Sequence, residues 1–250
     1  MAAMTENPSG RIAEDTPIAR QVCEVVRQGD VEALRQMLAS HPGLATARIT
    51  SGCGSGDDTQ AMSRSLLHIA TDWPGNLPRG AETVAVLVAA GADVNARFES
   101  RHTETPLHWA ASSDDVAVLD ALLDAGANIE AAGAVIAGGT PLADAVAFGQ
   151  WKAARRLIER GAQATLWQAA ALGLMDRVAN LMTDKTVPAA EITKAFWCAC
   201  HGGQREAAEY LLGRGADINW IGYDGLTALG AARRSGADDV AQWLLAKGGR

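Results

Sequence analysis

The chain has 250 residues, 48% of them hydrophobic, and a formal net charge of -7. An acidic chain lacks the basic surface that attracts nucleic acids and anionic membranes, so we expect neither as a partner. The sequence has no run of 18 or more apolar residues and no apolar signal region at its start, which favours a cytoplasmic location without a membrane span. Its four cysteines do not suggest a disulfide framework.

The first part of the chain alternates polar segments with helical patterns. Residues 1–16 are expected to form a disordered tail, and residues 17–48 have the apolar spacing of a divergent helix pair. The Gly- and Ser-rich segment 49–63, ITSGCGSGDDTQAMS, predicts an inserted loop that contains Cys53. Residues 72–80, DWPGNLPRG, predict a lengthened turn between the two helices of the next pair.

From residue 65 onward the chain repeats itself. The segments VLVAAGADVNA (86–96), ALLDAGANIEA (121–131) and YLLGRGADINW (210–220) superimpose, and Gly91, Gly126 and Gly161 are spaced 35 residues apart. Upstream of such segments stand SLLHIA (65–70), TPLHWAA (105–111), TPLADAV (140–146) and LTALGAA (226–232). A Thr that caps a helix, a Pro in the first turn and a Gly after the last turn are typical of short helices.

These motifs resemble those of the ankyrin repeat family. The resemblance covers roughly residues 17–250 and implies one continuous all-α solenoid of about seven helix pairs with short β-hairpin fingers. It also implies that His68 and His108 form hydrogen bonds between loops. In such arrays the concave surface and the finger tips bind partners.

The segment AFWCACHGG (195–203) allows three interpretations: a metal site, a nucleophile with its base, or part of a repeat. The repeat alignment places it on a helix, where Cys198 and His201 share a face and Cys200 is rotated by about 200° from Cys198. Zinc would then need ligands from other repeats, so we expect no metal. Cys198 with His201 remains open as a nucleophile and base, beside the alternative of a buried small thiol.

The alignment also gives columns of residues that we expect to face the concave groove. The predicted binding residues from these columns and the adjoining helix ends are Asp72, Trp73, Trp109, Phe148, Trp167, Gln168, Trp197 and His201, and Tyr223 and Asp224 are added from the last hairpin finger. Aromatic and small residues on such a surface favour recognition of a protein segment. Because the chain is acidic, we expect that segment to be neutral or basic.

The alternative is a small-molecule-binding protein or a cofactor-independent enzyme with acid–base chemistry of the isomerase type. It rests on the tryptophans and polar residues of the third to sixth repeats, which are suited to a Trp-lined pocket for a small organic ligand. Its candidate catalytic residues are Asp144, His201 and Cys198, with the Asp144 pKa raised by desolvation. The 49–63 loop would act as a lid. No cofactor motif is present, and none is expected to bind.

Overall fold

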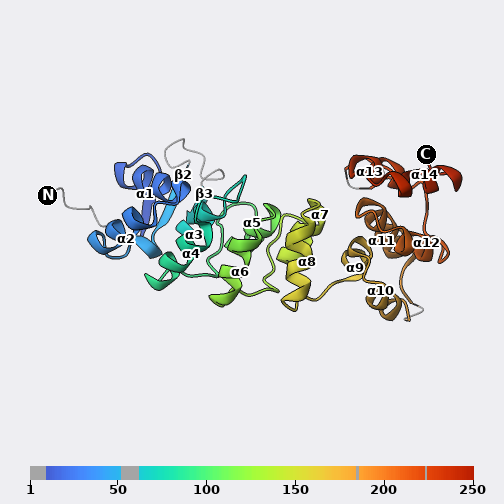
Figure 1. The fold of residues 1–250 in the computed structure, drawn as a ribbon, viewed down its shortest axis with the longest axis horizontal. Coiled ribbons are helices and arrows are strands. Elements are labelled where there is room, and N and C mark those ends of the chain that lie inside the picture. Colours follow the sequence, from blue (N-terminus) through green and yellow to red (C-terminus); the bar gives the residue numbers. More distant parts are fainter. Residues whose placement is uncertain (1–9, 52–61, 184–185, 223) are drawn as a thin grey trace. The chain divides into compact units, whose positions relative to one another are not determined.

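The structure, a computed structural model, describes residues 10–51, 62–183, 186–222 and 224–250. Within these ranges the helices follow one another in seven pairs (Figure 1). The pairs are α1 (Pro17–Gln28) with α2 (Val31–Ser40), α3 (Leu66–Ala70) with α4 (Gly80–Ala89), α5 (Pro106–Ser112) with α6 (Val116–Asp124), α7 (Pro141–Ala147) with α8 (Trp151–Glu159), α9 (Leu166–Leu172) with α10 (Met175–Leu181), α11 (Ala189–His201) with α12 (Arg205–Leu212), and α13 (Ala228–Arg234) with α14 (Asp238–Ala246). The prediction of about seven helix pairs is confirmed.

The first helix of most pairs begins after a hydroxyl residue. Thr16 and Thr227 accept a hydrogen bond from the backbone N–H three residues on, at 3.4 and 3.3 Å, which satisfies a donor that the helix itself leaves unpaired. Gly29 ends α1 with φ 66°, a left-handed conformation that other residues adopt at a cost. A β-carbon there would also lie 2.0 Å from the carbonyl oxygen of Pro78, so Gly29 also permits a close backbone approach.

Leucine and alanine fill the interior of the repeats. Leu67, Leu107 and Leu142 stand at equivalent positions in their helices and are fully buried. Burial of one leucine side chain stabilises a fold by about 1.5–3 kcal/mol, and the alanines between the leucines let neighbouring helices pack closely. Among residues 146–250, Phe196 is fully buried and its ring lies 6.5 Å from that of Trp243.

A small sheet accompanies the first repeats. Its strands are β1 (Arg11–Ala13), β2 (Arg48–Ser51) and β3 (Met62–Ser65), with β1 parallel and β3 antiparallel to the central β2. A further antiparallel bridge joins Ser63 of β3 to Glu99, which follows α4 in the chain.

This sheet corrects two predictions. Residues 11–13 are not disordered, because pairing with β2 satisfies their backbone hydrogen-bonding groups. The segment 49–63 is not a loop throughout, because its ends extend β2 and begin β3, and Ile49 is 1% exposed. Residues 1–9 and 52–61, including Cys53 and most of the proposed lid, lie outside the described residues.

The chain divides into two compact units where we expected one continuous domain. The N-terminal unit extends to Ala145 and the C-terminal unit comprises Val146–Arg250. The boundary between the two units falls within α7.

Candidate binding surface

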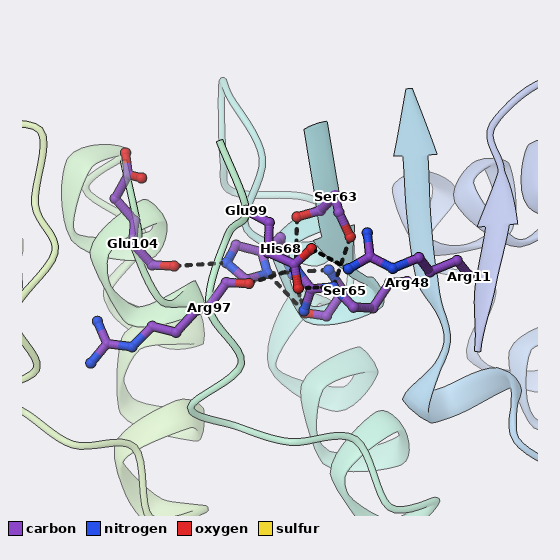
Figure 2. A network of polar contacts seen from close by, with 8 residues as sticks. All are labelled: Arg11, Arg48, Ser63, Ser65, His68, Arg97, Glu99 and Glu104. Atoms are coloured by element: carbon purple, nitrogen blue, oxygen red, sulfur yellow. Dashed lines mark hydrogen bonds and ion pairs between the residues drawn. The ribbon is translucent and has the colours of Figure 1, made fainter. Parts of the chain in front are cut away.

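His68 and His108 make the same contacts, one repeat apart. Nδ1 of His68 accepts from the backbone N–H and the hydroxyl of Ser65 at 3.3 and 2.8 Å, and Nε2 donates to the carbonyl of Glu104 at 3.1 Å (Figure 2). His108 repeats this pattern with Thr105 and with the carbonyl of Gly139. The hydrogen bonding between loops that the resemblance implied is therefore confirmed.

Both rings are neutral at physiological pH. Each histidine is 0% exposed, and desolvation lowers the pKa of His68 to about 3 and that of His108 to about 4. A buried neutral imidazole with both nitrogens engaged holds adjacent repeats together. It is poorly suited to exchange protons with a ligand.

Arg48 forms the second part of the network in Figure 2. Its Nε donates to the hydroxyl of Ser63 at 2.8 Å, and its guanidinium also donates to the carbonyls of Ser63 and Arg97 at 2.7 and 2.6 Å. Glu99 forms ion pairs with Arg48 at 3.2 Å and with Arg11 at 2.6 Å. These contacts hold the three strands of the sheet against the segment that contains Arg97 and Glu99.

In the C-terminal unit, two predicted binding residues make hydrogen bonds of the kind that His68 and His108 make in the N-terminal unit. The amide oxygen of Gln168 accepts from the backbone N–H and hydroxyl of Thr165, both at 2.8 Å, as Nδ1 does in His68 and His108. The indole N–H of Trp197 donates to the carbonyl of Leu226 at 2.9 Å, just before the capping Thr227. Counted from the capping Thr165, Gln168 stands at the position that His68 and His108 occupy in their helices, and Trp167 precedes it by one residue.

Asp144 is buried in the N-terminal unit. It is 2% exposed, and a carboxylate oxygen accepts from the backbone N–H of Ile136 at 3.4 Å. Desolvation raises its pKa to about 7, and the charge of Glu104 adds to this shift. Glu104 is itself buried, and its Oε2 has no hydrogen-bond partner among the described residues. The expected direction of the Asp144 shift is confirmed, although the carboxyl is nearly inaccessible.

Cys198, Cys200 and His201 are all buried on α11. Burial raises the pKa of the Cys198 thiol to about 12, so it is protonated at neutral pH and a weak nucleophile. Nδ1 of His201 is hydrogen-bonded to the hydroxyl of Ser235 at 3.0 Å, and burial lowers its pKa. In the described ranges we find no group of three His, Cys, Asp or Glu residues suited to a metal ion.

The His201 ring lies between two indoles. Its centroid is 5.1 Å from that of Trp151 and 5.6 Å from that of Trp197. Trp151 begins α8, and the sequence analysis did not select it, because its contact with His201 joins residues 50 positions apart. The catalytic alternative, with Asp144, His201 and Cys198 as its candidate residues, remains a prediction.

Trp73 is the most exposed large hydrophobic residue in the part of the chain that the structure describes. Its side chain is 76% exposed in the connection between α3 and α4. Asp72 accepts from the Trp73 backbone N–H at 3.0 Å and pairs with Arg64 at 3.1 Å. Asn76 donates through its backbone N–H to Asp115 at 2.7 Å. The connection is therefore fixed on both sides of the exposed indole.

The remaining predicted binding residues differ in how they are placed. Trp109 is half-buried, with its ring 4.9 Å from His68 and 5.2 Å from Phe98. Trp167 lies under the ammonium group of Lys194, 5.6 Å from the ring centroid, and Phe148 is 48% exposed. Asp224 pairs with Arg234 and caps the N–H of Leu226, while Tyr223 lies outside the described residues.

The N-terminal unit also contains a pocket that the sequence analysis missed. Its volume is about 270 Å³, and its lining comprises Glu14, Arg20, Cys23, Glu24, Arg27, Ile49 and Arg64. Four of these residues come from one face of α1, and the rest from β2, β3 and the segment after β1. The spacing of Arg20, Cys23, Glu24 and Arg27 is visible in the sequence as one helical face, but the opposite wall depends on the sheet.

The helices are paired and most pairs begin after a capping hydroxyl residue, and His68, His108 and Trp197 each form a hydrogen bond to the following repeat. These features define a helical repeat solenoid. The family description "Ankyrin repeats (3 copies)" matches residues 22–133, 67–166 and 166–250, so the chain belongs to the ankyrin repeat family. Ankyrin repeats are generally protein–protein interaction modules. No helix in the described residues is long and apolar enough to cross a membrane.

Two curated relatives come from nematodes. The chain is 30% identical over 254 residues to the Ankyrin repeat and KH domain-containing protein CBG24701 of Caenorhabditis briggsae, covering 98% of this chain and 9% of the relative. It is 30% identical over 177 residues to the Ankyrin repeat and KH domain-containing protein mask-1 of Caenorhabditis elegans, covering 67% of this chain and 7% of the relative. The chain thus spans less than a tenth of either protein.

Among solved structures, the crystal structure of the human ASB11 ankyrin repeat domain matches with a TM-score of 0.50. Sequence identity is 20%, and the match covers 92% of this chain and 97% of that one. At this identity the likeness supports the fold alone.

Proposed function

We propose that the chain is a protein-binding module and that the surface around Trp73 contacts its partner. The observation that carries the proposal is a tryptophan that is 76% exposed on a connection held by named polar contacts. Tryptophan is enriched among the residues that dominate interface energies, because it buries a large area on binding.

The fixed connection matters as much as the exposed ring. A mobile loop must lose conformational freedom when it binds, and this opposes association. The Asp72–Arg64 ion pair and the Asn76–Asp115 hydrogen bond hold the backbone on both sides of Trp73 before any partner arrives. Trp73 is thus presented at little additional entropic cost.

We expect Trp73→Ala to weaken partner capture by at least about tenfold, since truncation of a dominant interface residue costs about 2 kcal/mol or more. The measurement is affinity capture from cells with the wild-type chain and the variant in parallel, quantified by mass spectrometry. Proteins that bind through this surface should be depleted from the variant sample.

The matched control is Leu245→Ala, which truncates another exposed apolar side chain, 51% exposed on α14. It should leave the captured set unchanged. Equal capture by the wild-type chain and Trp73→Ala, with both folded by circular dichroism, would show that this surface is not the binding surface.

A further inference from the structure

We propose that the finger formed by residues 133–139 is a pH-dependent conformational switch, closed while Asp144 is protonated and open locally once Asp144 is ionised. The finger lies between α6 and α7, and the N–H of Gly133 donates to the carbonyl of Gly138 across it at 3.0 Å. The switch does not involve Trp73 and is therefore independent of the proposed function.

Asp144 holds the finger in a repeat that lacks the usual histidine. In α7 the position that His68 and His108 occupy in their helices is taken by Ala143, whose methyl group forms no hydrogen bond. The next residue is Asp144, and a carboxyl oxygen of its side chain accepts from the N–H of Ile136 in the finger at 3.4 Å. The contact that holds this finger is therefore one that can change its charge.

The tip of the finger, residues 134–138, depends on Asp144 more than the base does. Ala137 has φ 54°, a left-handed conformation that is unfavourable for a residue with a side chain. Within the described residues, Asp144 provides the one side-chain hydrogen bond to the tip, whereas Nε2 of His108 donates to the carbonyl of Gly139 at the base at 3.3 Å. The tip can therefore open while the base stays in place.

The surroundings of Asp144 make its ionised form unfavourable in the closed finger. Asp144 is 2% exposed, and Glu104, which is 6% exposed and has no partner for Oε2 in the described chain, lies near enough for its charge to act on Asp144. A buried carboxylate with one long hydrogen bond and a like charge beside it is strongly disfavoured. Desolvation and the charge of Glu104 raise the pKa of Asp144 to about 7. Ionisation near neutral pH therefore favours an open finger, in which water hydrates the carboxylate.

Two other titratable groups lie at the finger, and neither changes its charge between pH 6 and pH 8. Burial lowers the pKa of His108 to about 4, so its ring is neutral throughout this range. Arginine stays protonated in proteins, and Arg97 donates to two backbone carbonyls beside the finger. Residues 133–139 themselves carry no ionisable side chain. Asp144 is therefore the group whose ionisation can open the finger in this range.

Hydrogen–deuterium exchange of the full chain at pH 6 and pH 8 tests the switch. Each exchange rate is divided by the intrinsic rate at that pH, so that the opening equilibrium remains. With a closed-state pKa of about 7 and an open-state value of about 3.9, the open fraction of residues 133–139 should rise about tenfold from pH 6 to pH 8. The finger 97–104 is the internal control and should not open more at pH 8, because it is held by His68, whose pKa is about 3.

Two variants test the role of the carboxyl groups. Asp144→Asn keeps an amide oxygen for the N–H of Ile136 and does not titrate, so its finger should be equally protected at both pH values. Glu104→Gln keeps Asp144 but removes the like charge, which lowers the pKa of Asp144, so the rise in opening should be smaller than in the wild-type chain. A thermal melt verifies that each variant folds, and the wild-type comparison of the two fingers needs no variant.

A loss of protection that is confined to residues 133–139 and disappears in Asp144→Asn supports the switch. Equal protection of this finger at both pH values in the wild-type chain would overturn it. An equal loss in the finger 97–104 would also overturn it, because the chain would then be opening as a whole, and so would a loss of the same size in Asp144→Asn.

Discussion

Replacing His68 with alanine is expected to lower the free energy of unfolding of the N-terminal unit by about 3–5 kcal/mol. The substitution opens a cavity at a fully buried position and leaves the Ser65 hydroxyl and the Glu104 carbonyl without their shared partner. Urea denaturation followed by circular dichroism measures the loss.

The chain itself suggests the control. Gln168 stands at the equivalent position of α9 and accepts the same two hydrogen bonds from its capping threonine. His68→Gln should therefore keep the contacts within the cap and cost about 1 kcal/mol, the value of one altered hydrogen bond. A glutamine variant as unstable as the alanine variant would show that the imidazole acts through its shape and not through its hydrogen bonds.

The contribution of Asp144 to the stability of the N-terminal unit should fall as the pH rises from 5 to 8. Its pKa is raised to about 7 in the folded chain, mainly by desolvation, whereas an unfolded aspartate titrates near its ordinary value of about 3.9. The folded state therefore holds a proton that the unfolded state has released. This stabilisation is fully present below the unfolded pKa and is lost as the pH passes through the folded one.

Between pH 5 and pH 8 the loss attributable to Asp144 amounts to about 2–3 kcal/mol. Asp144→Asn is the matched variant, since its amide oxygen still accepts from the Ile136 N–H but does not titrate. His68 and His108 favour unfolding at low pH, yet they are the same in both chains and cancel in the difference. Urea denaturation at pH 5 and pH 8 gives the change in the free energy of unfolding for each chain. This change should be about 2–3 kcal/mol less favourable to folding in the wild-type chain than in the variant. An equal change in both chains would contradict the buried, protonated carboxyl.

Local features made most of the fold predictable. Capping threonines, prolines in first turns and terminal glycines act within a few residues, and each repeat carries its own set. The contacts that the sequence did not predict join distant residues: Arg11 with Arg48 in the sheet, and Trp151 with His201.

The binding surface was predictable only in part. Trp73 stands out because it lies in an unusually long connection rich in Pro and Gly, where an indole has little to cover. Trp197 was selected because the repeat alignment places it in a column of residues on the inner helices, but its N–H replaces that of a histidine, which only the position of the Leu226 carbonyl reveals. The pocket could not be predicted from the sequence, because Ile49 and Arg64 form part of its lining. Their position opposite α1 depends on how β2 and β3 pair.

The most direct test of the binding surface is site-specific photocrosslinking in cells. A benzophenone amino acid replaces Trp73 in one chain and Leu245 in another, and adducts are compared after irradiation. We predict discrete protein adducts from position 73 and none of the same mass from position 245. Adducts that are identical at both positions, or present only at position 245, would contradict the claim that the chain binds its partner around Trp73.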